Sequence, residues 1–323
     1  MAKVIDLVKG AYSDAAVGII DEVSKVVPEI AFFDARLVAG TQFKTLARTS
    51  LPTTGFRALG AGIDASSNGY ALKTFDLGIL AGLVQMDKAA ALADALRSKE
   101  EVLSDEAIGV IISAMKTLAG KVWYGSKDGA EKFAGVATLC EDDLVVSAGG
   151  STANAESSVF AVGNSATKAC GLVFSKNSGF FLEGELEFKE GTMSGSNSKP
   201  VPCSWTDLTG WAGFSAVNAK KMARLANLDS STHSLTDALL AKVVNAYTKA
   251  NDGIRPDALF ASYAQLEKLQ ASRAANHVLP GQKGSVSAEF PTDFQGIPLI
   301  ATNAILDTEA VWTAESSSSS SGS

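Results

Sequence analysis

The sequence predicts an α+β fold, in which helices and mainly antiparallel strands occupy separate stretches of one chain. Three observations carry this prediction. An apolar stripe with helical spacing runs through residues 104–124. A tip rich in glycine and serine near residue 60 joins two strand-like runs, and residues 210–262 have the pattern strand, turn, helix, turn, strand. The 323 residues are enough for about two lobes.

The composition is that of a globular protein with an acidic surface. Hydrophobic residues make up 46% of the chain, charged residues 20%, and the net charge is −7. This balance argues against nucleic-acid binding as the main activity, because phosphate contacts need a clustered basic surface. The strongest basic cluster is Lys220, Lys221 and Arg224, which we interpret as a solvated or subunit-facing patch.

Cysteine use and hydropathy indicate a reducing, aqueous compartment. Cys140, Cys170 and Cys203 are odd in number, far apart and without C-x-x-C spacing, so neither a disulfide framework nor a zinc site is indicated. The N-terminus lacks the continuous apolar core of a signal peptide, and no apolar run approaches the roughly 18 residues that span a bilayer. We therefore expect a cytoplasmic product without membrane contact.

The N-terminal part of the chain is expected to be largely extended. A short helix is predicted to end at Pro28, and the Thr-, Val- and Phe-rich run that follows favours extended structure. A long two-stranded ribbon is predicted next, with Thr53–Ala58 running out, Ala71–Val84 running back, and a flexible tip between them.

The ribbon tip also matches the dinucleotide-binding pattern G-x-G-x-x-[GA], at Gly60, Gly62 and Ala65. That pattern holds a pyrophosphate only where a helix begins directly after the glycines. Here Ser-Ser-Asn-Gly follows at 66–69, which is turn chemistry. We therefore predict no nucleotide site and no cofactor.

A helical stretch over 87–103 leads into the longest predicted helix, over 104–124. Ser104 is its predicted cap, and Gly125 is expected to end it. At this length the helix is about 30 Å long, enough to form the spine of a domain. Its Met115 and Trp123 are predicted to be core residues, together with the apolar stripe Ile108, Ile111, Ile112, Leu118 and Val122.

Strands are predicted at 158–162, 171–176 and 184–190, with polar loops over 140–157 and 191–202. Within 210–262, an S-x-x-D capping box at Ser234 and Asp237 precedes a helix, and Gly253 suits the left-handed position after its end. That helix has one apolar face, formed by Leu235, Leu239, Val243 and Ala246.

The C-terminal part completes the predicted elements. A short helix begins after Ser262, and a polar loop covers 280–287. A turn and a strand follow over 290–302, and the Ser-rich tail 315–323 is expected to be disordered.

Catalytic chemistry has little support in the sequence. The two histidines, His233 and His277, lie outside any catalytic motif and are interpreted as surface residues. Glu183, Glu185 and Glu187 alternate along a strand and offer a divalent-metal alternative, with a solvated strand face as the plainer interpretation. We predict no catalytic residues, no cofactor-binding residues and no metal ligands.

Four phrases of the sequence, in their order and spacing, resemble a family. They begin at Leu51 (LPTTGFRAL, continuing to Ala91), Gly210 (GWAGFSAVNAKKMARLANLD), Asn251 (NDGIRPDALFAS) and Phe290 (FPTDFQGIPLIATNAIL). Together they are similar to tailed-bacteriophage major capsid proteins with the HK97-like fold, across nearly the whole chain. The resemblance implies a structural shell protein that forms hexamers and pentamers of an icosahedral head around double-stranded DNA, and no enzyme.

The resemblance also implies a domain plan. Residues 1–50 would be an N-terminal arm and lead-in, 51–90 the extended loop, and 91–145 the peripheral domain with its spine helix. Residues 146–275 would mainly form an axial domain with a central mixed or antiparallel sheet and flanking helices, to which most of the block 210–262 belongs. Residues 276–314 would return to the peripheral domain.

Partners follow from the same resemblance. Scaffolding would be a separate protein or absent, and portal and decoration proteins are possible partners. Packaged DNA would be contacted without sequence specificity, in particles assembled in the cytoplasm of a bacterial host. Lys73 and Asn68 lie in the ribbon, but neither matches a crosslinking motif. The alternative within the same fold is an encapsulin-like nanocompartment shell that packages an enzyme.

Overall fold

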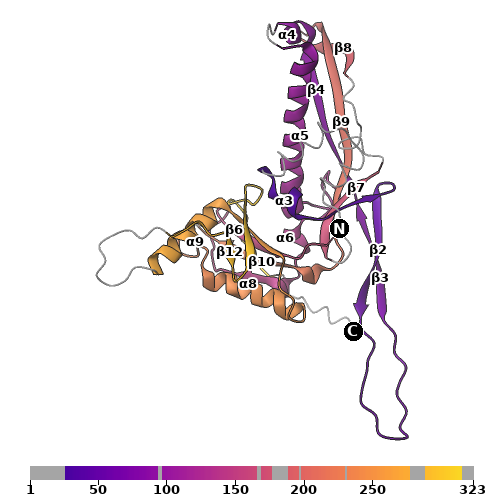
Figure 1. Ribbon diagram of the computed structural model, residues 1–323, viewed down its shortest axis with the longest axis vertical. Helices are drawn as coiled ribbons and strands as arrows, with labels where there is room; N and C mark the ends of the chain where they lie inside the picture. The colour runs from indigo at the N-terminus through magenta and orange to yellow at the C-terminus, as the bar shows by residue number, and fades with distance from the viewer. Residues whose placement is uncertain are drawn as a thin grey trace, which may run out of the picture.

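The computed structural model describes residues 26–93, 97–165, 169–176, 188–195, 198–229, 231–276 and 288–314. Within these ranges three β-sheets and their helices form an elongated upper part, a side lobe and a projecting ribbon (Figure 1). Helices and mostly antiparallel strands thus coexist as separate stretches, which confirms the α+β class. In the described part of the chain no helix is both long and apolar enough to cross a membrane.

The elongated upper part is built from one long helix that lies on a long antiparallel pair of strands. Helix α5 (Lys99–Tyr124) lies along strands β4 (Gly78–Asp87) and β9 (Pro200–Ala216), which pair antiparallel along their length (Figure 1). Three further strands join this sheet, whose order is β1-β7-β9-β4 with β8 also on β9: β1 (Ala35–Val38), β7 (Cys170–Ser175) and β8 (Lys189–Ser194).

The spine helix begins earlier than the sequence predicted. Ser98 is its N-cap: the Ser98 hydroxyl accepts from the Glu101 backbone N–H, and the Glu101 carboxylate accepts from the Ser98 N–H. This reciprocal capping box satisfies two backbone donors, so the predicted start at Ser104 is wrong. The predicted end at Gly125 is confirmed. The helical stretch predicted for 87–103 includes the separate short helix α4 (Lys88–Leu92), capped by Asp87.

An aromatic core joins the spine helix to the sheet of β4 and β9 and to the sheet of the side lobe. Trp123 and Met115 are fully buried, which confirms their predicted role. The Trp123 ring stacks on Phe160 at a centroid distance of 4.9 Å and lies 5.0 Å from Phe260. Phe33 makes an edge-on contact with Phe214 at 5.5 Å. Such aromatic groups bury large apolar areas, so this cluster holds the upper part on the side lobe.

The side lobe is a six-stranded sheet with two flanking helices. The strand order is β12-β13-β11-β6-β10-β5. These strands are β12 (Asp293–Phe294), β13 (Ile297–Thr302), β11 (Ala258–Ser262), β6 (Ser157–Val162), β10 (Met222–Leu228) and β5 (Val145–Ser147), and the helices are α8 (Asp237–Ala250) and α9 (Tyr263–Asn276). The strands predicted at 158–162 and 171–176 are confirmed, as are the closing strand of the block 210–262 and a strand within 290–302.

Strand β10 was missed because it lacks the alternation of a half-buried strand. All seven of its residues are buried, since β5 and β6 flank it in the sheet and α8 lies against it. The predicted cap of α8 is also wrong: Thr236, two residues after Ser234, accepts from the Leu239 N–H. The predicted left-handed glycine is confirmed, with Gly253 at φ +88°.

Pro28 begins the short helix α3 (Pro28–Phe32), because proline suits the first helical position, where its missing N–H is not needed. The helix predicted to end at Pro28 lies almost entirely outside the described residues. One further expectation is corrected. The polar loop predicted for 191–202 is largely a hairpin of β8 and β9. Short turns of helix, α6 (Val136–Leu139), η1 (Asp142–Leu144) and η2 (Ala219–Lys221), complete the described elements. Residues 1–25 and 315–323 lie outside the described residues.

Candidate functional site

The projecting ribbon is a two-stranded sheet of β2 (Gln42–Ser50) and β3 (Gly69–Asp76). The predicted boundaries are wrong in two ways. The outgoing strand ends before Thr53, and the predicted return strand is divided at Leu77, after which β4 joins the sheet of β9. The chain changes sheet at Gly78, where a larger residue would not fit. A Cβ at this position would lie 2.3 Å from the Glu131 carbonyl oxygen and clash with it.

The base of the ribbon is anchored to the body through one face. Phe43 is buried, stacks on Phe75 at 6.1 Å, and lies in an apolar cluster with Leu77, Val173 and Val217. The Arg36 guanidinium lies 4.7 Å from the Phe43 ring centroid. The Lys73 ammonium donates to the Val217 carbonyl oxygen at 3.1 Å. The ribbon therefore has a fixed direction where it leaves the body.

The opposite face of the ribbon is exposed and carries a group of apolar side chains among polar ones. Leu46 and Leu72 are directly opposite each other in the register, and 68% and 64% of their surfaces are exposed. Tyr70 continues the row, opposite Arg48. Within the described residues β2 and β3 pair only with each other, so both outer edges carry backbone groups available to another chain.

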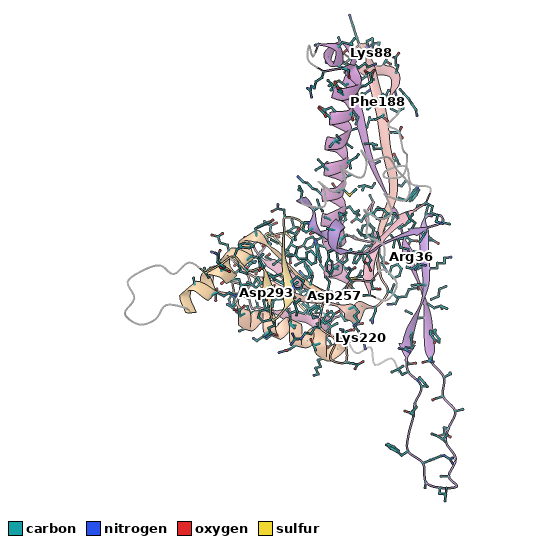
Figure 2. The ribbon with its side chains drawn as sticks, in the orientation of Figure 1. Arg36, Lys88, Phe188, Lys220, Asp257 and Asp293 are labelled. Atoms are coloured by element: carbon teal, nitrogen blue, oxygen red, sulfur yellow. The ribbon has the colours of Figure 1, made fainter. Side chains whose placement is uncertain are left out.

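Beyond the paired strands, residues 51–68 form a long tip. Nearly every residue in it is exposed, and Phe56 and Leu59 are as exposed as in an unfolded chain. Within the tip, Arg57 donates to the Ala61 carbonyl oxygen and Ser66 to that of Thr53. The tip extends past the rest of the molecule (Figures 1 and 2).

Charge also distinguishes the ribbon from the rest of the chain. Over residues 42–76 four cations, Lys44, Arg48, Arg57 and Lys73, stand against Asp64 and Asp76, giving +2 in a chain of −7. An exposed apolar face with cations beside it, on a chain that is acidic elsewhere, is typical of a contact surface for another protein.

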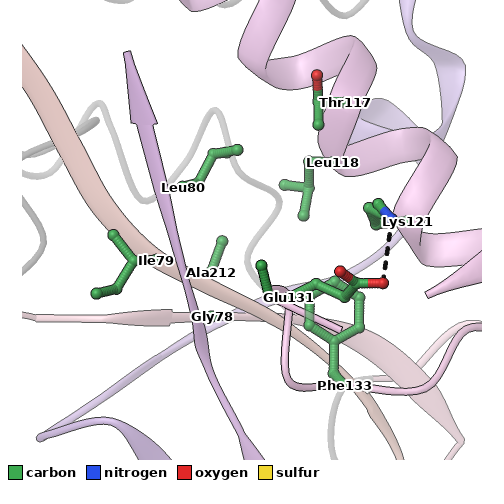
Figure 3. A pocket seen from close by; sticks show the side chains of 10 residues that line it. Gly78, Ile79, Leu80, Thr117, Leu118, Lys121, Glu131, Phe133 and Ala212 are labelled. Atoms are coloured by element: carbon green, nitrogen blue, oxygen red, sulfur yellow. Dashed lines mark hydrogen bonds and ion pairs between the residues drawn. The ribbon is translucent and has the colours of Figure 1, made fainter. Parts of the chain in front are cut away.

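A small pocket lies between α5 and β4, near the base of the upper part (Figure 3). Its volume is about 150 Å³. Its lining is mainly apolar, and the Lys121–Glu131 ion pair, at 3.1 Å, borders it. The lining residues are Gly78, Ile79, Leu80, Thr117, Leu118, Lys121, Ala130, Glu131, Phe133 and Ala212. Sequence reasoning missed this pocket because four segments distant in the chain form it.

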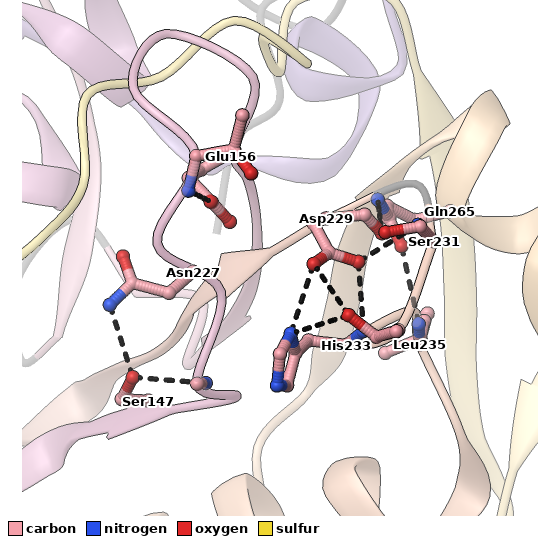
Figure 4. Close-up of polar contacts among 11 residues, drawn as sticks. Ser147, Glu156, Asn227, Asp229, Ser231, His233, Leu235 and Gln265 are labelled. Carbon is pink, nitrogen blue, oxygen red and sulfur yellow. Dashed lines mark hydrogen bonds and ion pairs between the residues drawn. The ribbon is translucent and has the colours of Figure 1, made fainter.

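His233 lies beside Asp229 at the start of the loop before α8 (Figure 4). Its Nδ1 is 2.9 Å from Asp229 Oδ2, and 40% of the His233 side chain is exposed, as expected for a surface residue. Burial raises the pKa of Asp229, but hydrogen bonds from His233, Ser231 and Thr232 outweigh it and hold that pKa well below its usual range. The Thr232 hydroxyl donates to Asp229 at 3.2 Å and lies 3.1 Å from His233 Nδ1, so these contacts close the loop.

The predicted basic cluster is divided in the structure. Lys220 is exposed, and Lys221 lies over the Tyr247 ring at 5.8 Å. Arg224 is buried, which corrects its predicted place in a solvated or subunit-facing patch. Its guanidinium is 2.6 Å from the Glu309 carboxylate and donates to Ser158 at 2.9 Å, because β10 lies inside the side lobe.

Metal and thiol chemistry find no site among the described residues. No group of three or more His, Cys, Asp or Glu side chains there could hold a metal ion. All three cysteines are free, and burial raises the pKa of Cys140 to about 12. Glu183, Glu185, Glu187 and His277 lie outside the described residues.

Comparison with known proteins agrees with an assembly surface. A family model described as "Major capsid protein GP7" matches residues 11–313. No curated protein matches the sequence.

Solved structures resemble the fold. A chain of bacteriophage Epsilon15 aligns with a TM-score of 0.60 and 19% identity, covering 87% of this chain and 88% of its own. The bacteriophage JBD30 capsid aligns with a TM-score of 0.49 and 12% identity, covering 84% and 89%. An encapsulin of Synechococcus elongatus aligns with a TM-score of 0.41 and 8% identity, covering 63% and 88%.

Proposed function

This chain belongs to the major capsid protein GP7 family, and we propose on that premise that it builds the icosahedral head of a tailed bacteriophage around double-stranded DNA. The family is one of structural capsid proteins, so the chain is a self-assembling shell subunit of the virion and not an enzyme. Its fold is the HK97-like capsid fold.

One observation carries the proposal for how assembly works. The ribbon is held at its base by Phe43 and Lys73, while its outer face and tip have apolar groups that no described part of the chain covers. Contiguous exposed apolar surface on a soluble subunit marks a contact site. The ribbon therefore lies on a neighbouring subunit in the assembled shell and buries Leu46, Leu72 and Tyr70 there.

The finer architecture belongs to the same proposal. The subunits form hexamers and pentamers, with residues 1–50 as an arm and lead-in, 51–90 as the extended loop, and 91–145 as the main part of a peripheral domain. Residues 146–275 mainly form the axial domain, and 276–314 return to the peripheral domain. Strand β4 belongs to the segment 51–90 and β9 to the segment 146–275. The two strands pair along their length, which supports a plan in which the segments share one sheet.

Partners outside the shell are proposed on chemical grounds. With a net charge of −7 the subunit contacts packaged DNA without sequence specificity and through few phosphate contacts. Separate scaffolding, portal and decoration proteins complete the particle, which assembles in the cytoplasm of the host bacterium. A nanocompartment that encloses an enzyme is not favoured, because the matching family model is that of a major capsid protein.

Purified protein tests this proposal through its size. Light scattering and negative-stain electron microscopy, with and without co-expressed scaffolding protein from the same phage, are expected to show closed shells that contain five- and sixfold clusters. A compact monomer under every condition would contradict the proposal. Shells that recruit a cellular enzyme and no DNA would favour the nanocompartment alternative.

A further inference from the structure

The tip of the ribbon carries an aromatic side chain that is fully exposed among the described residues. Phe56 shows 112% of its reference surface to solvent, the highest exposure among the large hydrophobic residues of the described part. It lies in an extended run without paired strands, while Arg57 next to it is held by the Ala61 carbonyl oxygen at 2.8 Å. A phenylalanine in this position is suited to insertion into a partner.

The pocket between α5 and β4 has the size of such a ring. Its volume is about 150 Å³ and its walls include Leu80, Leu118, Phe133 and Ala212 (Figure 3). An apolar cavity of about 150 Å³ is known to accept benzene. The phenylalanine side chain ends in a ring of that size, so one such ring fills the pocket.

The surroundings of the pocket are also those of a protein contact. Thr117 and Ala130 line it and are exposed. Glu131 is held beside it by Lys121 at 3.1 Å and by the Ser126 N–H at 2.8 Å. An apolar centre with a polar rim is the usual anatomy of an interface anchor. Because Glu131 is already bonded within its own chain, an entering ring displaces no ion pair.

The occupant has to come from another copy of the chain. The ribbon leaves the body in a direction fixed by Phe43 and Lys73, and its tip points away from α5 (Figure 1). The chain self-assembles, so each subunit offers one tip and one pocket to its neighbours. Such a head-to-tail contact closes into rings when the rotation between neighbours permits.

We propose that Phe56 of one subunit inserts into the pocket between α5 and β4 of a neighbouring subunit, and that this contact fixes the position of the ribbon in the shell. This inference rests on the proposed function and adds to it a specific pair of surfaces.

Crosslinking in assembled shells tests the pairing. The double variant Phe56→Cys with Thr117→Cys is treated with a short bismaleimide and run on a denaturing gel. A ladder of linked subunits is expected from shells, and single bands from unassembled subunits and from each single variant. The matched control pairs Phe56→Cys with Glu106→Cys, an exposed position on the same helix about 16 Å from residue 117. Shells without a ladder, or an equal ladder in the control, overturn the proposal.

A double-mutant cycle gives an independent test that needs no cysteine. Phe56→Ala empties the pocket, and Ala130→Trp fills it from its exposed side. Each is expected to raise the subunit concentration needed for assembly about tenfold, the effect of losing one modest interface anchor. The two together are expected to have little more effect than either alone, because they remove the same contact. Leu59→Ala, at an equally exposed tip position, is the matched control and is expected to be near wild type.

The outcomes separate this inference from the proposed function. Wild-type protein that never forms shells contradicts the function itself. The proposed function stands and the pocket contact is overturned if the two variants, Phe56→Ala and Ala130→Trp, raise the subunit concentration needed for assembly by independent factors that multiply. The same conclusion follows if Leu59→Ala raises that concentration as much as Phe56→Ala.

Discussion

Trp123 donates its indole N–H to the carboxylate of Glu29 over 2.9 Å, and both side chains are fully buried. Thr302 donates its hydroxyl to the same carboxylate oxygen. Glu29 lies on α3, Trp123 on the spine helix and Thr302 at the end of β13, so one acceptor joins three segments distant in the sequence. This contact ties the segment that follows the N-terminal residues to the core.

Replacing Glu29 tests the importance of this acceptor. Glu29→Ala leaves the buried Trp123 N–H without an acceptor, and the Thr302 hydroxyl loses its acceptor and keeps only the Ala304 N–H as a partner. The variant is expected to lower the free energy of unfolding by about 2–4 kcal/mol. Glu29→Gln keeps a carbonyl oxygen in place and is expected to lie within about 1 kcal/mol of wild type. Urea unfolding of unassembled subunits measures both. Equal losses for the two variants would show that the hydrogen bonds are unimportant.

The buried ion pair between Arg224 and Glu309 gives a second prediction. Arg224→Met leaves the Glu309 carboxylate buried without its cation and is expected to cost about 3–5 kcal/mol of stability. The double variant Arg224→Met with Glu309→Gln removes both charges and keeps an amide oxygen as acceptor for the Tyr124 or Ser158 hydroxyl, so it is expected to recover most of the loss. Chemical denaturation of the three proteins checks this. A double variant no more stable than the single one would contradict the charge argument.

The loop at Asp229 predicts a dependence on acid. Hydrogen bonds from His233, Ser231 and Thr232 lower the pKa of Asp229 against the opposing effect of burial. A carboxyl with a lowered folded-state pKa stabilises the fold above its unfolded value of about 3.9, and this contribution is lost as the pH falls toward the folded value. The melting-temperature gap between wild type and Asp229→Asn is therefore expected to keep its full size above about pH 5 and to narrow below pH 4. A gap that widens in acid would show that the charged Asp229 carboxylate does not stabilise the fold.

Shortening the ribbon separates folding from assembly. Deleting residues 60–68 removes exposed tip and almost no core, so the subunit is expected to keep its thermal transition and to assemble poorly. Phe43→Ala, at the ribbon base, removes a buried ring and is expected to destabilise the subunit by about 3 kcal/mol or more. Differential scanning calorimetry and light scattering on both variants compare the effects. A deletion that abolishes the transition would contradict the placement of the tip outside the core.

Local sequence signals correctly predicted elements with a strong apolar periodicity or with a glycine that ends a helix. The spine helix ends at Gly125 as expected, Gly253 has the left-handed backbone, and Met115 and Trp123 are core residues. The errors arose where two local signals competed. Ser98 and Ser104 are both plausible caps, and only the position of Glu101 three residues after Ser98 distinguishes them.

Other features depend on tertiary contacts that a single sequence does not reveal. Strand β10 is buried on both faces, so it lacks alternation, and Arg224 within it resembles a surface cation until Glu309 is placed beside it. The predicted return strand of the ribbon is divided at Leu77, because the residues after it form β4 and pair with β9 instead of β2. The glycine-rich tip indicated an extended ribbon, but the alternation of Leu46, Tyr70 and Leu72 on one face became visible only with the register.

The ribbon of one subunit is expected to bind its neighbour in a closed shell, and a cryo-electron microscopy reconstruction of assembled particles would show this contact. Residues 51–68 of each subunit are expected to lie on an adjacent subunit, with Leu46, Leu72 and Tyr70 buried between the two. A shell in which this segment projects freely into solvent, or folds back on its own subunit, would show that the ribbon is not an assembly contact.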